Sequence, residues 1–176
     1  MQYTAFLRGM NVGGHRITNV ELCDCFRELG IDNPWAFLAS GNVAFESSSK
    51  SKARLSKLIQ NGLHAALGYD VPTFLRTADE VAQIATNTVF TEEELAAAGK
   101  VQVCLLARTP DAATRKKALS FALPQDNLAI DGQELYWLPA GRLTDSELDH
   151  KGIAAAVGPM TVRTLNTMVR LAKKFK

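Results

Sequence analysis

Short apolar runs and helically spaced apolar stripes follow one another in a fixed order in the first part of the chain. Four runs predict β-strands, because they are short, rich in aliphatic and aromatic residues and bounded by turn residues; they cover 3–8, 35–39, 43–47 and 71–77. Two stretches between them, 18–29 and 50–67, carry apolar residues at helical spacing. The order strand, helix, strand, strand, helix, strand is the split β-α-β pattern of a ferredoxin-like unit.

Start and stop signals support both helices. Thr18 and Glu21 form a capping box, in which each side chain satisfies a backbone N–H group of the other residue. Gly30 and Gly68 mark the two helix ends. The residues expected to face the core are Leu22, Cys23, Phe26 and Leu29 in the first helix, and Leu55, Leu58, Ile59, Ala66 and Leu67 in the second.

The same order of elements begins again after a helical connector at 77–100, which holds two more capping boxes, Thr77 to Glu80 and Thr91 to Glu94. Strands are expected at 101–107, 127–131 and 134–138. Helical stretches are expected at 109–123, with Pro110 at the favoured first position, at about 145–157 and at 161–174. Gly132 and Gln133 join the last two strands as a hairpin. The predicted fold class is therefore α+β, with duplicated ferredoxin-like (split β-α-β) halves and antiparallel or mixed sheets.

Composition excludes few functions but limits the partners and the cellular compartment that we expect. Hydrophobic residues make up 47% and charged residues 22%, which suffices for a globular core. The net charge of +2 is too small to indicate a nucleic acid or an anionic membrane as partner. No export signal or membrane span is recognisable. The chain has three cysteines, Cys23, Cys25 and Cys104, an odd number, and their spacing is not that of a zinc site. We therefore expect a cytoplasmic protein with reduced thiols, no metal and no membrane partner; the oligomeric state is not predicted.

The segment "RGMNVGG", residues 8–14, allows two interpretations. One is a tight turn, with Arg8 paired inside the protein. The other is an anion site, in which backbone N–H groups at Gly13 and Gly14 and the guanidinium of Arg8 face a phosphate or carboxylate. Both lead us to expect a positive φ at Gly13 or Gly14. A nucleotide-binding P-loop is disfavoured, because His15 and Arg16 stand where Lys and Ser or Thr are required.

Topology brings this loop near a second polar turn. The first and second strands of a split β-α-β sheet run parallel, so the loop at 8–14 and the turn "SGN" at 40–42 are expected at the same sheet edge. Such convergent loops commonly form ligand sites. The last expected helix has an apolar stripe and, on another side, Arg163, Asn166, Thr167 and Arg170. That side is either solvated or turned towards polar loops.

Other motifs carry less information. Asn42 and Ala44 stand where an RNA-recognition module needs stacking aromatic residues, which disfavours that function. The acidic segment 144–151, with His150, reads as a capping box from Thr144 to Glu147 rather than as a metal site. For an enzyme, the candidate titratable groups are Asp24, His15 and Tyr136. No catalytic residue, reaction or cofactor is assigned.

Three segments resemble a bacterial family catalogued as domain of unknown function 1697: "YTAFLRGMNVGGHRI", "ASGNVAFES" and "TVRTLNTMVRL". Its members typically show L-R-G-[IM]-N-V-G-G, S-G-N-V-x-F and T-x-R-N-x-N-T-V. The resemblance spans essentially the whole chain and implies duplicated ferredoxin-like halves, but no activity. The family's polar signature falls on Arg8, Asn11, Gly13, Gly14, Ser40, Gly41, Asn42, Arg163, Asn166 and Thr167. Thr164 and Leu165 depart from the pattern, which has Asn and usually Trp there.

We therefore expect these signature residues to bind a small anionic or phosphate-bearing ligand at the edge formed by the Gly-rich loop. An enzyme of unknown reaction in the same polar cleft and a protein-interaction module are the alternatives. The chain reads as a single family domain, residues 1–176, made of a half at 1–90 that includes the connector and a half at 91–176 that includes the C-terminal helix.

Overall fold

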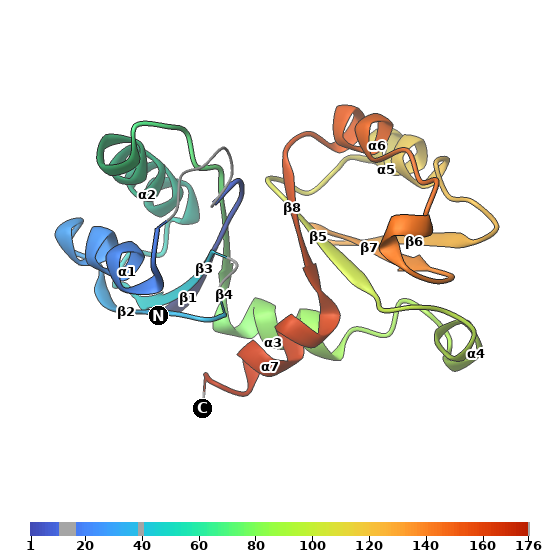
Figure 1. Ribbon diagram of the computed structural model, residues 1–176, viewed down its shortest axis with the longest axis horizontal. Helices are drawn as coiled ribbons and strands as arrows, with labels where there is room; N and C mark the ends of the chain where they lie inside the picture. The colour runs from blue at the N-terminus through green and yellow to red at the C-terminus, as the bar shows by residue number, and fades with distance from the viewer. Residues whose placement is uncertain (11–16, 39–40, 176) are drawn as a thin grey trace. The chain divides into compact units, whose positions relative to one another are not determined.

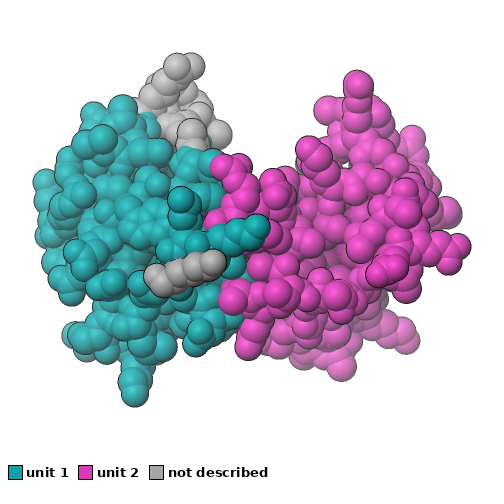
Figure 2. Space-filling model, turned by 90° about the horizontal axis from the view of Figure 1, so that it is seen from below, with its two compact units in different colours: residues 1–81, 171–176 teal, residues 82–170 magenta. Residues whose placement is uncertain are grey.

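The computed structural model describes residues 1–10, 17–38 and 41–175 of the chain (Figure 1). Its contacts divide the chain into two compact units, coloured separately in Figure 2. Unit 1 comprises Met1–Val81 and Leu171–Lys176, and unit 2 comprises Ala82–Arg170. Each unit has its own four-stranded sheet. The division into halves at 1–90 and 91–176 stays a prediction.

Unit 1 contains the six expected elements in the expected order: β1 (Gln2–Leu7), α1 (Asn19–Glu28), β2 (Asp32–Ala36), β3 (Asn42–Glu46), α2 (Lys52–Leu67) and β4 (Thr73–Thr77). The sheet order is β2-β3-β1-β4, and neighbouring strands pair antiparallel. β1 and β2 therefore run parallel with β3 between them. This is the ferredoxin-like topology that the sequence predicts.

The edge strand β2 departs from its expected position. It begins at Asp32 and ends at Ala36, so Phe37 and Leu38 lie beyond it. Its pairing with β3 shifts register between Asp32 and Trp35, and Pro34 lies within the shifted stretch. An edge strand tolerates proline, because its outer N–H groups have no ladder partner. The irregular edge also hinders pairing with a strand of another molecule.

Helix starts in unit 1 follow the local signals. The N–H of Glu21 donates to Thr18 Oγ1 at 3.2 Å, and the N–H of Thr18 donates to the Glu21 carboxylate at 2.8 Å, so the predicted capping box is present. At the start of α2, the side chain of Ser51 accepts a hydrogen bond from the N–H of Arg54. These caps satisfy backbone donors that have no partner within the helix.

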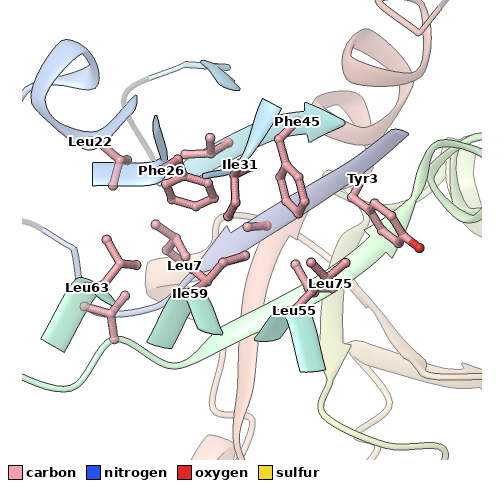
Figure 3. Packing of buried hydrophobic residues seen from close by; sticks show 13 residues of the cluster. Tyr3, Leu7, Leu22, Phe26, Ile31, Phe45, Leu55, Ile59, Leu63 and Leu75 are labelled. Atoms are coloured by element: carbon pink, nitrogen blue, oxygen red, sulfur yellow. The ribbon is translucent and has the colours of Figure 1, made fainter. Parts of the chain in front are cut away.

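The core of unit 1 lies between α1, α2 and one face of the sheet (Figure 3). Figure 3 shows Leu55, Ile59 and Leu63 of α2 pointing towards the strands, where the rings of Tyr3 and Phe45 stack with centroids 5.6 Å apart. Leu58 was expected in this core but is 41% exposed. The buried row repeats every four residues, and Leu58 lies about 100° around the helix from Ile59. The expectation for Ala66 is also wrong, since it is exposed.

Two helices follow unit 1's last strand: α3 (Ala78–Thr86) and α4 (Glu92–Ala96). Both predicted capping boxes of this connector are present. The N–H of Thr77 donates to the Glu80 carboxylate at 2.8 Å, and the N–H of Glu80 donates to Thr77 Oγ1 at 3.1 Å. Thr91 and Glu94 make the same reciprocal pair at α4.

Unit 2 repeats the architecture of unit 1 and adds a short 3-10 helix and a terminal helix. After α4, its elements are β5 (Gln102–Leu106), α5 (Ala112–Leu119), β6 (Asp126–Asp131), β7 (Glu134–Pro139), η1 (Leu143–Asp145), α6 (His150–Val157), β8 (Met160–Thr164) and α7 (Leu165–Ala172), of which Leu171 and Ala172 are assigned to unit 1. The sheet order is β6-β7-β5-β8, again antiparallel throughout. Helices α5 and α6 lie side by side over one face of this sheet (Figure 1), and a core that includes Leu135, Trp137 and Ile153 fills the layer between. The α+β class with duplicated ferredoxin-like halves is thus confirmed.

Three local expectations in unit 2 are wrong. The stretch 161–174 is not one helix, because Met160–Thr164 forms β8, paired with β5, and α7 begins only at Leu165. Pro110 precedes helix α5, whose cap is Asp111. No capping box forms from Thr144 to Glu147; helix α6 begins at His150, where Asp149 accepts a hydrogen bond from the N–H of Gly152. Long-range strand pairing and a nearer cap outweigh the local sequence signals in these places.

Candidate functional site

The end of β1 and the start of β3 meet at one edge of the unit 1 sheet. The N–H of Leu7 donates to the carbonyl oxygen of Gly41 at 2.8 Å. The next residue, Arg8, donates its N–H to the carbonyl oxygen of Pro72 at 2.9 Å, just before β4 begins. We call this region, with Arg8, Gly9, Met10, Gly41 and Asn42, the loop edge. The predicted approach of the first loop to the β2–β3 turn therefore holds for the described residues.

Gly41 is required by the backbone at the loop edge. Its φ is +68°, a conformation that residues with a side chain rarely adopt. A Cβ atom at this position would also lie 2.9 Å from Cγ of Met10 and 3.2 Å from Cβ of Leu7. Glycine thus allows the turn to approach the end of β1 closely.

Asn42 stabilises the same turn from inside. It is fully buried, and its side-chain amide donates to the carbonyl oxygen of Phe37 at 2.9 Å. In return, the N–H of Phe37 donates to the carbonyl oxygen of Asn42 at 2.8 Å. The amide group of Asn42 therefore closes the β2–β3 connection. Its role in binding a ligand stays a prediction.

Arg8 has the opposite environment. Its side chain is exposed, and its guanidinium makes no hydrogen bond or ion pair with any residue that the structure describes. The interpretation in which Arg8 pairs inside the protein thus finds no partner among those residues. The positive end of α1 lies nearby, because the side chain of Asn19 donates to the carbonyl oxygen of Leu38 in the β2–β3 connection at 3.2 Å.

Four of the predicted binding residues lie outside the described residues: Asn11, Gly13, Gly14 and Ser40. The expected positive φ at Gly13 or Gly14 falls there too, as does His15, one of the enzyme candidates.

Arg163 lies on β8 and not on a helix, opposite Val103 of β5. Its guanidinium donates to Thr161 Oγ1 at 2.9 Å and to the carbonyl oxygen of Val162 at 2.8 Å. Burial lowers the pKa of Arg163 to about 10. The side chain still carries its charge at neutral pH.

The end of the third family motif forms a helix cap. Thr164 Oγ1 accepts a hydrogen bond from the N–H of Thr167 at 3.1 Å and lies 2.9 Å from Thr167 Oγ1. Thr164 is thus the N-cap of α7, and the family's Asn at this place is an equally good capping residue. Thr164 therefore supplies the same kind of capping oxygen that an Asn would supply here. Asn166 is exposed on the first turn of α7.

Arg163, Asn166 and Thr167 belong to unit 2, whereas Arg8, Gly41 and Asn42 belong to unit 1. A patch shared by both groups stays a prediction.

Of the enzyme candidates, the structure describes Asp24 and Tyr136. Asp24 pairs with Arg27 on the exposed face of α1, and Tyr136 is 1% exposed within β7. All three cysteines are free thiols, and burial raises the pKa of Cys104 to about 12, which suppresses its nucleophilic thiolate. Among the residues that the structure describes, no three His, Cys, Asp or Glu side chains are grouped so that they could hold a metal ion.

The sequence gives no signal for a buried carboxylate in unit 2. Asp126, the first residue of β6, is 1% exposed and accepts hydrogen bonds from Trp137 Nε1 at 2.7 Å and from Ser146 Oγ at 3.0 Å. It lines a cavity of about 290 Å³ together with Arg142 and Asp145. Trp137 lies on β7 and the other three residues lie in the segment 142–146, so neither spacing nor a motif identifies the group beforehand.

None of the described helices is both long and apolar enough to cross a membrane. The cytoplasmic location stays a prediction.

Comparison with known proteins supports the family resemblance over the part of the chain that holds the first two motifs, whereas the third motif, at 161–171, lies beyond the matched residues. The model of a family described as "Protein of unknown function (DUF1697)" matches residues 1–136. Among solved structures, the conserved bacterial protein SP0830 from Streptococcus pneumoniae is similar, with a TM-score of 0.73 and 19% sequence identity over 99% of this chain and 98% of that chain. At this identity the likeness concerns the fold. No significant match was found among curated proteins.

Proposed function

The chain belongs to the DUF1697 family, which is itself described as of unknown function, and we propose that its loop edge binds a small anionic or phosphate-bearing ligand. The observation that carries the proposal is the exposed guanidinium of Arg8, which has no partner among the described residues. The proposed site extends to Asn11, Gly13, Gly14 and Ser40, which are included on sequence grounds. Arg163, Asn166 and Thr167 stay predicted members.

The chemistry of Arg8 supports an anion. A guanidinium presents planar N–H donors that match two oxygens of a phosphate or carboxylate at once. The backbone N–H of Arg8 donates a hydrogen bond to the carbonyl oxygen of Pro72. This bond holds the backbone of Arg8 at the end of β1, while its side chain is exposed. This combination presents a charge at a defined place.

The surroundings of Arg8 also suit an anion. Helix α1 begins at Asn19, whose side chain contacts the β2–β3 connection, so the positive end of the helix dipole lies at this edge. Part of that end is occupied by the capping box of Thr18 and Glu21. The hydrogen bond from the N–H of Leu7 to the carbonyl oxygen of Gly41 holds the two strand ends of the loop edge together.

Thermal unfolding in the presence of anions tests the proposal. We expect pyrophosphate or inorganic phosphate to raise the Tm of the protein, since a ligand that binds the folded state stabilises it by mass action. Arg8→Ala should weaken binding by about ten- to a hundredfold, the loss of one charged hydrogen-bonding contact.

Arg54→Ala is the matched control. Arg54 is likewise exposed, on the first turns of α2 in unit 1. It lies beyond the opposite end of the sheet, because α2 follows the end of β3 that pairs with the start of β1. The proposal fails if neither anion stabilises the wild type, or if the two variants lose stabilisation equally.

A further inference from the structure

Leu38, in the connection between β2 and β3, has a backbone conformation that a bulky residue disfavours. Its φ is +59°, in the left-handed region, where such a residue is an outlier. Gly or Asn adopts that conformation more readily. Residues held in such conformations cluster at functional sites, where the surrounding structure maintains them. The backbone of the turn therefore does not explain why a leucine stands at this position.

The hydrophobic core does not explain Leu38 either. Its side chain is 38% exposed, and the residue lies outside the core cluster of unit 1. Its backbone, by contrast, is held on both sides. The carbonyl oxygen of Leu38 accepts the hydrogen bond from the Asn19 side chain, and the preceding residue, Phe37, exchanges hydrogen bonds with Asn42. A fixed backbone thus presents an apolar side chain at the surface.

Two further apolar side chains are accessible at or beside the loop edge. Val20 follows Asn19 in the first turn of α1 and is 69% exposed. Met10 is half-buried, and its Cγ lies 2.9 Å from the place that a Cβ atom of Gly41 would take. The accessible side chains of this region therefore combine apolar groups with the charge of Arg8.

Leu38 and Arg8 lie at the same end of the unit 1 sheet. Arg8 follows the end of β1 and Leu38 lies just beyond the end of β2, and these two strands run parallel on either side of β3. Neighbouring strands are about 4.8 Å apart, so the ends of β1 and β2 are roughly 10 Å apart. A small organic molecule can therefore reach both residues.

We propose that the ligand of the loop edge is an organic anion, with a phosphate or carboxylate at Arg8 and a short hydrocarbon chain or an aromatic ring against Leu38, Val20 and Met10. This inference rests on the proposed function, because it names the class of ligand for the same site. Covering exposed apolar side chains adds hydrophobic free energy to the binding of such a compound. Inorganic phosphate has no apolar part and gains nothing from these side chains.

Methyl phosphate and phenyl phosphate are the probes, because both are phosphate monoesters and they differ in apolar area. Titrations of the full chain, followed by NMR spectra of a 15N-labelled sample, give the two dissociation constants. We expect phenyl phosphate to bind about five- to thirtyfold more tightly than methyl phosphate, the gain from partly covering an aromatic ring. Arg8→Ala should weaken the binding of both compounds.

Leu38→Asn separates the apolar side chain from the backbone, because Asn tolerates a positive φ better than most residues. The variant should fold, lose at least about threefold of the preference for phenyl phosphate, and bind methyl phosphate within about twofold of the wild type. Val20→Thr, which keeps the branched shape but adds a hydroxyl group, should also lower the preference. Leu58→Asn is the control, because Leu58 is 41% exposed but belongs to α2. It should leave the preference unchanged.

A wild type that binds both phosphates equally overturns this inference and leaves the proposed function intact. If neither compound binds, the proposed function fails with it. The inference is also overturned if Leu38→Asn and Val20→Thr both keep the preference for phenyl phosphate, or if Leu58→Asn lowers it equally. Should Leu38→Asn fail to fold, the comparison of Val20→Thr with Leu58→Asn decides.

Discussion

Leu7 and Gly41 join the ends of β1 and β3: the N–H of Leu7 donates to the carbonyl oxygen of Gly41 at 2.8 Å, and a Cβ atom on Gly41 would lie 3.2 Å from Cβ of Leu7. The contact exists because residue 41 has a positive φ and no side chain. It sets the spacing between Arg8 and the β2–β3 turn, and so connects the backbone requirement of one glycine to the proposed ligand site.

Gly41→Ala is expected to lower the free energy of unfolding by about 2 kcal/mol or more. About 1–2 kcal/mol comes from the left-handed backbone conformation, and the rest from the close contact with Met10 and Leu7. Urea unfolding, monitored by tryptophan fluorescence, measures this change in the free energy of unfolding.

Gly30→Ala is the control for this prediction. Gly30 has a similar φ of +72°, but a Cβ atom there would meet nothing within 4 Å. It should therefore show the backbone cost of about 1 kcal/mol alone. Equal losses in the two variants would show that the packing between Gly41 and Leu7 contributes nothing to stability.

The order of elements was predictable because each signal was local. Thr18 with Glu21 and Thr91 with Glu94 form capping boxes within one helical turn, so the sequence contains the whole interaction. The repeat of strand and helix order then leaves few topologies to choose from, and the ferredoxin-like one is observed.

The strand β8 could not be predicted from local sequence signals. Thr161 to Thr164 continue the helical spacing of α7, yet they pair with β5, more than fifty residues earlier in the chain. Arg163 therefore lies on a strand. The group around Asp126 is still harder to foresee, since Trp137 and Ser146 reach it from separate segments. Arg8 was recognisable because its strand, its loop and its charge are neighbours in sequence.

Thr164 allows a direct test of the family's third motif. Thr164→Ala should lower the free energy of unfolding by about 1 kcal/mol, because the N–H of Thr167 loses its capping oxygen. Thr164→Asn, which restores the family residue, should retain stability within about 0.5 kcal/mol, because Asn and Thr are both good N-caps. Chemical unfolding of the three proteins gives these differences.

Thr144→Ala serves as the matched control, because Thr144 caps no helix and is exposed. Its expected effect is below about 0.5 kcal/mol. A loss of stability with Thr164→Asn as large as with Thr164→Ala would contradict the capping role and indicate a hydroxyl-specific function.

The last prediction concerns acid stability and the carboxylate of Glu80. Burial by itself raises the pKa of Glu80, but hydrogen bonds from the Lys52 ammonium and from the N–H of Thr77 outweigh it, so the pKa is lowered overall. A carboxyl whose pKa is lower in the folded state stabilises the protein above its unfolded pKa of about 4.3. That contribution is lost as the pH falls through the lower, folded value. The free energy of unfolding should therefore decrease between about pH 5 and pH 3.

Glu80→Gln isolates this contribution. At pH 7 the variant should be less stable by about 1 kcal/mol, a small value because the Lys52–Glu80 pair is one third exposed and solvent screens it. Once the pH falls below the lowered pKa of Glu80 in the folded state, both proteins have a neutral group at position 80, so their stabilities should converge. Lys52→Met keeps the Thr77 contact and should remove part of the pH dependence. Unfolding curves for wild type and Glu80→Gln that stay parallel from pH 7 to pH 3 would refute the link between the carboxylate and acid stability.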